Sequence, residues 1–268
     1  MSGSLIAFRW ELLKLASQKR TWLGVAPAAI GPIVYLLLEL AQGPPGAPLA
    51  ENLGHTGVAF SLVVFKLIAV IGPAVIAALV AGDIVAGEDS DGTLKTILTR
   101  SLGRSEVLLG KVWALFTYLA FAMTIFFLVS TIGGLLAWGF HPLINISGVQ
   151  ISALHALLLD IPALALYCLP VLSIACFGVF LSVATRQSVA AVGGTVIYAM
   201  GLQGVAVIHA ISGVDPYLLT NQLTAWHALF ETPFHIGPIL RAIWVSVVFA
   251  LPPLIAALVI FNRRDVAD

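Results

Sequence analysis

The charged residues that could carry chemistry are concentrated in one short stretch of an otherwise apolar chain. Residues 87–111 read GEDSDGTLKTILTRSLGRSEVLLGK and hold eight of the 13 basic and 13 acidic residues. These eight are Glu88, Asp89, Asp91, Lys95, Arg100, Arg104, Glu106 and Lys111. Clustered carboxylates can bind metal ions or transfer protons, and a lysine after a glycine-rich loop can bind phosphate. Each of these chemistries requires a particular spacing.

The segment from Gly103 to Val112 has the residue types of a phosphate-binding loop but not their spacing. Six residues separate Gly103 from Gly110, and Val112 follows Lys111. A P-loop has four residues between its glycines and a serine or threonine after its lysine, whose hydroxyl reaches Mg²⁺. We therefore expect no ATP or other cofactor site and no catalytic residue in this chain.

The acidic residues Asp83, Glu88, Asp89 and Asp91 are interpreted as structural and not as a metal or acid–base site. No histidine lies among them. Carboxylates at the start of a helix accept hydrogen bonds from its free amide groups and favourably oppose its dipole. We predict that these acids mark the entrance to a short helix, and we predict no metal site.

The composition places most of the chain in a lipid bilayer. Of its 268 residues, 60% are hydrophobic and only 10% are charged, whereas about 25% are charged in soluble domains. A bilayer core about 30 Å thick needs about 20 apolar residues per helix. Six segments satisfy this length, and we predict an all-α integral membrane protein with spans at residues 21–40, 58–81, 112–138, 157–183, 189–211 and 239–261.

The basic residues fix the expected orientation. Four precede the first span, four lie between the second and third, one is Arg186, and two follow the last span, which places 11 of 13 on one face. The positive-inside rule puts this face, with both termini, in the cytoplasm of a plasma or inner cell membrane. The six histidines then lie at the outer side, without metal-ligand spacing: His55, His141, His155, His209, His227 and His235.

The whole chain, residues 1–268, is expected to form one transmembrane domain with two further features. Within residues 1–20, Leu5, Phe8, Leu12 and Leu15 form one apolar stripe, which predicts an amphipathic helix in the cytoplasmic interface. The last outer loop, residues 212–238, is semi-apolar, as in a re-entrant segment of short helices.

The charged stretch itself contains a short amphipathic pattern. Leu94, Ile97 and Leu98 recur at helical spacing, with Lys95 on the other flank. Residues 82–111 are therefore expected to be a cytoplasmic segment containing a short helix with an apolar ridge. This ridge either docks a cytoplasmic partner or lies on the protein's own inner surface.

This stretch resembles the corresponding region of type-2 ABC exporter permeases. An acidic residue and Gly-Thr-Leu follow the second span, then come an apolar ridge, an arginine and a Gly-Lys pair before the third span. The matching positions are Glu88, Gly92, Thr93, Leu94, Leu98, Arg104, Gly110 and Lys111. The chain has Ser101-Leu102-Gly103 where that family usually has a proline before the arginine.

The resemblance implies that residues 82–111 hold a coupling helix that contacts a separate ATPase subunit. The implied contact residues are Glu88, Asp91, Gly92, Thr93, Leu94, Lys95, Ile97, Leu98, Arg104 and Lys111. It further implies an exporter of two permease chains, in contact with membrane lipid, and two ATPase chains that bind ATP and Mg²⁺. No nucleic-acid partner is expected.

Two ionisable residues fall inside predicted spans and are candidates for function. Lys66 lies in the second span and Asp160 in the fourth, at comparable depth from the outer face. Instead of contacting substrate, Lys66 could extend its ammonium group to the membrane surface, or it could pair with Asp160.

Two other function classes also stay open. One is a standalone secondary carrier, which would favour repeated halves, and the other is a non-transporting membrane anchor or regulator of an ATPase.

Overall fold

The computed structural model describes residues 3–42, 56–68, 72–90, 92, 103–145, 147–207 and 215–263. In these residues the protein is almost entirely helical, which confirms the predicted all-α class. The helices are α1 (Gly3–Ser17), α2 (Lys19–Gln42), α4 (Gly57–Ile68), α5 (Gly72–Asp83), α6 (Ala86–Ser90), α8 (Arg104–Trp138), α9 (Ala153–Thr185), α10 (Ser188–Val207), η1 (Asp215–Tyr217), η2 (Thr220–Phe230) and α11 (Ile236–Arg263). A short antiparallel ribbon pairs β1 (Leu143–Ile144) with β2 (Gln150–Ile151).

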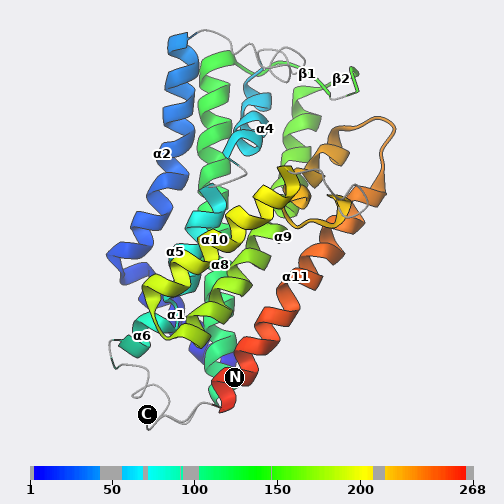
Figure 1. The fold of residues 1–268 in the computed structure, drawn as a ribbon. Coiled ribbons are helices and arrows are strands. Elements are labelled where there is room, and N and C mark those ends of the chain that lie inside the picture. Colours follow the sequence, from blue (N-terminus) through cyan, green and yellow to red (C-terminus); the bar gives the residue numbers. More distant parts are fainter. Residues whose placement is uncertain are drawn as a thin grey trace.

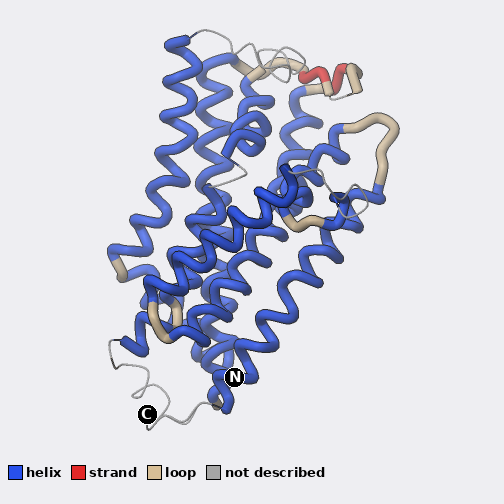
Figure 2. The backbone as a smooth tube through the Cα atoms, viewed as in Figure 1, coloured by secondary structure: helices blue, strands red, loops and turns tan. Residues whose placement is uncertain are grey.

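The long helices form an elongated bundle with two distinct ends (Figures 1 and 2). One end holds α1, α6, the first turns of α8 and the last turns of α11. We call it the α1 end. The other end holds the β1–β2 ribbon, and we call it the ribbon end. The first and last described helices therefore finish at the same end of the bundle, as the predicted topology requires.

Within the described residues, five helices are long and apolar enough to cross a membrane. They are Thr21–Ala41 within α2, α8, α9, Ser188–Val205 within α10, and α11. They correspond to the predicted spans at 21–40, 112–138, 157–183, 189–211 and 239–261. The predicted span at 58–81 falls on α4 and α5, which have 12 residues each. Residues 69–71 between them lie outside the described residues.

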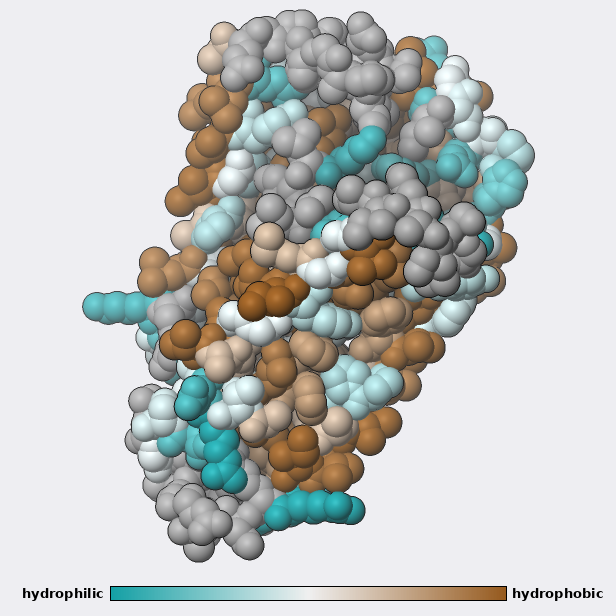
Figure 3. Space-filling model, in the orientation of Figure 1, coloured by the Kyte–Doolittle hydropathy of each residue, from teal (hydrophilic) through white to brown (hydrophobic). Residues whose placement is uncertain are grey.

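The two central helices, α8 and α9, differ in burial from the peripheral ones. In their most apolar windows, 44% and 56% of residues are buried, against 22% in α2 and 17% in both α10 and α11. Figure 3 shows the result, with apolar side chains covering much of the exposed middle of the molecule. An outer surface this apolar is suited to lipid and not to water.

Aromatic stacking joins α4 to the two central helices. The ring of Phe65 on α4 lies 4.8 Å from that of Tyr167 on α9 and 5.6 Å from that of Phe126 on α8. Such pairs add about 0.5–1.5 kcal/mol each beyond their buried area. They position the half of α9 nearer the ribbon end against α4.

Helix α1 has apolar side chains on two sides. Phe8, Leu12 and Leu15 from the predicted stripe pack against the hydrophobic core. Ile6, Trp10 and Leu13 instead point outward and are exposed, and α1 packs mainly on α8. Three of the four stripe residues therefore pack against the protein itself, whereas Leu5 and a different apolar row on α1 are exposed.

The segment before α11 forms the short helices η1 and η2 (Figure 1). Helix η2 packs against α9 and α11 and buries Leu223, Trp226 and Phe230. Within the predicted loop 212–238, residues 212–214 lie outside the described residues. Of the rest, η2 is packed against the protein, whereas residues 232–237 are exposed and lead into α11.

Candidate functional site

The structure describes four of the ten predicted partner-contact residues: Glu88, Gly92, Arg104 and Lys111. The other six lie outside the described residues: Asp91, Thr93, Leu94, Lys95, Ile97 and Leu98. The site is therefore built from the two ends of the charged stretch, where α6 finishes and α8 begins. The role of all ten in partner contact stays a prediction.

Glu88 is held in place by a cap on its short helix. The hydroxyl oxygen of Ser182 on α9 accepts hydrogen bonds from the backbone N–H groups of Val85, at 3.2 Å, and Ala86, at 2.9 Å. The first amide groups of a helix have no partner within it, so a side chain from elsewhere can satisfy them. Here α9 supplies that side chain and fixes the start of α6, which carries Glu88 two residues later.

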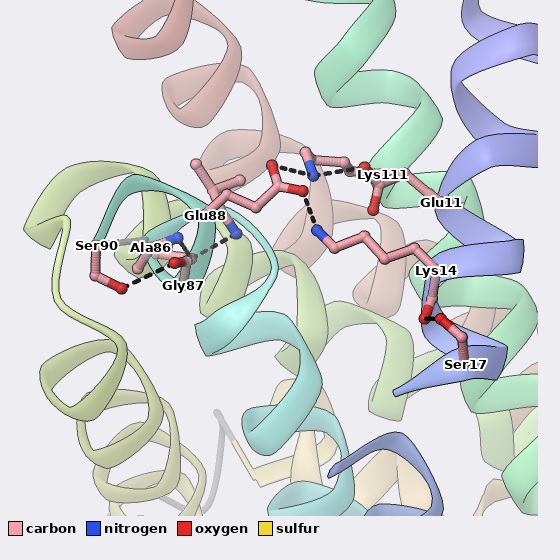
Figure 4. Close-up of polar contacts among 10 residues, drawn as sticks. Glu11, Lys14, Ser17, Ala86, Gly87, Glu88, Ser90 and Lys111 are labelled. Carbon is pink, nitrogen blue, oxygen red and sulfur yellow. Dashed lines mark hydrogen bonds and ion pairs between the residues drawn. The ribbon is translucent and has the colours of Figure 1, made fainter. Parts of the chain in front are cut away.

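Lys111 lies wholly inside the protein, with 0% of its surface exposed. Its Nζ lies 2.6 Å from Oε2 of Glu88 and donates a hydrogen bond of 2.7 Å to Oε1 of Glu11 on α1. Glu88 forms a further ion pair through Oε1 with Lys14, also on α1. Figure 4 shows the four side chains turned toward one another. We call this alternating row, Lys14–Glu88–Lys111–Glu11, the ion-pair network.

The charges in the network balance, with two carboxylates and two ammonium groups. Burial by itself raises the pKa of Glu88, but the positive charges and hydrogen bonds of Lys111 and then Lys14 outweigh it and lower the pKa below its usual value. Glu88 is therefore ionised at neutral pH. Buried ion pairs add little net stability, but loss of one partner is costly because it leaves an uncompensated charge. The network thus fixes the mutual position of α1, α6 and α8.

Arg104 makes a second connection at the α1 end. Its Nη1 donates a hydrogen bond of 3.1 Å to the backbone carbonyl oxygen of Asn262 on α11. One residue earlier, the N–H of Gly103 donates to Oε2 of Glu106 at 3.0 Å, which caps the start of α8. Helix α8 therefore begins at Arg104, eight residues before the apolar run predicted as a span.

Gly92 ends the α6 region in a turn. It has φ +68°, a left-handed conformation that favours glycine, and its N–H donates a hydrogen bond of 3.1 Å to the carbonyl oxygen of Asp89. The chain leaves α6 at this point.

A cavity of about 510 Å³ lies beside the network. Glu11, Lys14 and Glu88 line it together with Asp83 on α5 and Ser188 on α10. The hydroxyl of Ser188 donates a hydrogen bond to Oδ1 of Asp83. The cavity thus brings together polar side chains from helices that are distant in sequence.

Glu11 and Lys14 belong to the network but were not among the site residues predicted from the sequence. Glu11 lies on the same face as the predicted stripe, and the residues buried on α1 are Ala7, Glu11 and Leu15. Glu11 lies four residues from Ala7 and four from Leu15, within an apolar face of the helix. A carboxylate in that position indicates a buried partner of opposite charge.

The two residues predicted as intramembrane candidates, Lys66 and Asp160, differ in burial and in their contacts. Lys66 on α4 is exposed, whereas Asp160 on α9 is fully buried and bonded to Ser61 on α4. The ion pairs between described residues do not join Lys66 to Asp160. Across the described residues, no group of three or more histidine, cysteine or acidic side chains is placed to hold a metal ion.

The fold and the site define a helical membrane protein whose first helix is ion-paired to both α6 and α8, on either side of the charged segment. Residues 7–202 match the family described as ABC-2 family transporter protein. Because this match covers most of the chain, the protein belongs to the ABC-2 transporter family, as the resemblance in the charged stretch indicated.

A curated relative agrees with this assignment over a shorter region. The chain is 35% identical over 79 residues to the probable ABC transporter permease protein NosY of Stutzerimonas stutzeri. The aligned region covers 30% of this chain and 29% of that protein, so the match spans less than a third of the relative's length.

Proposed function

We propose that the chain is the membrane-spanning permease subunit of an ATP-driven exporter. In this proposal six helices cross the membrane, with α4 and α5 together making the second crossing. A separate ATPase subunit binds ATP and Mg²⁺ and docks on the segment between α6 and α8. A second permease chain completes the path for the substrate. The α1 end, with both chain termini, faces the cytoplasm of the cell membrane.

The observation that carries the proposal is the ion pair between Glu88 and Lys111. These residues flank the segment that contains the other predicted contact residues, and their charged groups lie 2.6 Å apart. The two ends of this segment are therefore held together. A segment held in this way can transmit a push from a partner to the helices on either side of it.

Several helices would receive that push. Glu88 lies in α6 and Lys111 lies in α8. Lys14 and Glu11 include α1 in the same unit, and Arg104 connects the start of α8 to the end of α11. Closure of the ATPase subunits would thus reach four helices through close polar contacts, which suits a transition between two packed arrangements.

Co-purification tests the partner. The chain, tagged at its C-terminus, is isolated from native membranes in mild detergent, and an ABC ATPase is sought by mass spectrometry. Leu94→Asp should reduce the recovered ATPase at least tenfold, because a charge on the apolar ridge opposes docking. The matched control is Leu154→Asp, which changes an exposed leucine in the first turn of α9, at the ribbon end. Equal recovery with both variants, or no ABC ATPase with the wild type, overturns the proposal.

Inside-out membrane vesicles test the direction of transport and separate the alternatives. The compounds accumulated by vesicles with and without the chain are compared in the presence of ATP and of a non-hydrolysable analogue. Export predicts at least one compound that accumulates only with ATP and the wild-type chain. Accumulation independent of ATP indicates a secondary carrier. No accumulation, despite a bound and active ATPase, indicates an anchor or regulator.

A further inference from the structure

Asp160 is a fully buried acid in the interior of the apolar bundle. It lies on α9, two turns from the ribbon end of that helix, and 0% of its surface is exposed. One of its oxygens, Oδ2, lies 3.2 Å from the hydroxyl oxygen of Ser61 on α4, which is also fully buried. The proposed coupling mechanism does not use either residue.

The hydroxyl of Ser61 has two partners but only one proton. Its oxygen lies 3.2 Å from Oδ2 of Asp160 and 3.2 Å from the backbone carbonyl oxygen of Val58. A carbonyl oxygen can only accept, and a serine hydroxyl donates once. If Asp160 were ionised, Ser61 could satisfy only one of these acceptors. With a carboxylate, one proton would have to be shared between two acceptors, whereas a neutral carboxyl group of Asp160 that donates to Ser61 makes each contact a full hydrogen bond.

The second carboxyl oxygen of Asp160 also indicates that the group is protonated. Oδ1 of Asp160 is buried and accepts no hydrogen bond from any described residue. A carboxylate spreads its charge over both oxygens and needs several donors when it is removed from water. A neutral carboxylic acid has a much smaller requirement.

The nearest lysine does not neutralise Asp160. Lys66 shares α4 with Ser61 but follows it by five residues, which places it about 140° around the helix axis. It is exposed, and it takes no part in an ion pair with Asp160. Ser61 therefore directs a neutral hydroxyl at α9, while the cation lies on another side of α4.

Among the described residues, the other helices packed against α9 place no cation in an ion pair with Asp160. His227 on η2 is uncharged at neutral pH, because burial and then the positive charge of Lys66 lower its pKa to about 4. Arg241 on α11 lies over the ring of Tyr217, 5.7 Å from its centre. Helix α8 has no ionisable side chain after Tyr118.

On α9 itself the two titratable neighbours of Asp160 differ. His155 is exposed at the start of the helix. Tyr167 is buried, and its hydroxyl has no hydrogen-bond partner among the described residues. A neutral phenol supplies no charge, so neither residue balances a buried carboxylate.

We propose that Asp160 is a proton-binding site within the membrane, at which the neutral carboxyl group donates to Ser61 and Ser61 donates to Val58. The bound proton holds α4 against α9 at the ribbon-end half of the bundle. Loss of the proton leaves an uncompensated charge between two packed helices and removes one of the two hydrogen bonds. The contact between α4 and α9 is thus conditional on protonation.

Infrared spectroscopy of the purified protein tests this directly. At neutral pH the wild type should show the carbonyl stretching band of a protonated carboxyl group, and Asp160→Asn should lack it. The asparagine amide can donate to Ser61 in place of the carboxyl group, so this variant should keep the melting temperature to within about 2 °C. Should it not fold, Ser61→Ala provides a second comparison, in which the band remains but shifts in frequency.

Lys66→Met distinguishes the proposal from an ion pair. The proposal expects the same band in this variant as in the wild type. A band that is absent from the wild type and appears only in Lys66→Met would show that Asp160 is ionised and balanced by Lys66, and would overturn it. Identical spectra for the wild type and a folded Asp160→Asn would overturn it as well.

Discussion

Lys111 and Glu11 are a hundred residues apart in the chain, and Nζ of the lysine lies 2.7 Å from Oε1 of the glutamate in the protein interior. This contact changes the role expected for the first helix. A helix that only lies in the membrane interface has no reason to bury a carboxylate against a lysine of a spanning helix. Helix α1 is therefore part of the unit that contains α6 and the start of α8, and its position in the membrane interface stays a prediction.

Lys111→Met should destabilise the protein by about 3–5 kcal/mol, because it leaves Glu11 and Glu88 buried with only Lys14 to balance them. The measurement is thermal unfolding in detergent. Lys66→Met is the matched control, since it removes an exposed lysine of α4, and it should cost about 0.5 kcal/mol or less.

The double variant Lys111→Met with Glu11→Gln tests whether the loss comes from the ion pair. Removal of both charges should cost less than the sum of the two single changes, by about 0.5–3 kcal/mol. Strict additivity would indicate that Lys111 acts through packing alone.

Acid should weaken the network through Glu88. Its pKa is lower in the folded protein than the ordinary value of 4.5, so the unfolded chain binds the proton more readily. Its stabilising contribution is complete above the ordinary value and is lost as the pH falls through the lower, folded value. The gap in melting temperature between wild type and Glu88→Gln should therefore narrow from about pH 5 to about pH 3. A gap that stays constant would contradict this assignment.

Gly110→Ala should separate α1 from α8. A β-carbon at Gly110 would lie 2.5 Å from Cβ of Ala7 and 2.9 Å from the backbone nitrogen of Phe8. Overpacking of this kind costs about 1–3 kcal/mol. Gly193→Ala on α10 is the control, because a β-carbon there meets nothing within 4 Å. Equal stability of the two variants, measured by thermal unfolding, would show that α1 moves aside without cost.

Hydropathy was enough to predict five of the long helices, because apolar length is a property of the sequence alone. The same reasoning, with the family resemblance, selected Glu88 and Lys111, which the structure brings together. It did not select Glu11 and Lys14, since the partner of a buried carboxylate depends on which helices pack side by side. It also considered Asp160 with Lys66, whereas the structure places Ser61 against Asp160. Ser61 and Lys66 lie on different sides of α4, and only the side with Ser61 faces Asp160.

Helix α9 carries both Asp160 and Ser182, one toward each end, and each makes a polar contact with the α4–α6 region. The 22 residue steps from Asp160 to Ser182 span about 33 Å at 1.5 Å per residue, close to the thickness of a bilayer core. A sliding movement of α9 along its own axis by a single residue step would disturb both contacts at once. Movement of α9 could therefore transmit a change in the protonation of Asp160 to the contact between Ser182 and α6, about one bilayer thickness away.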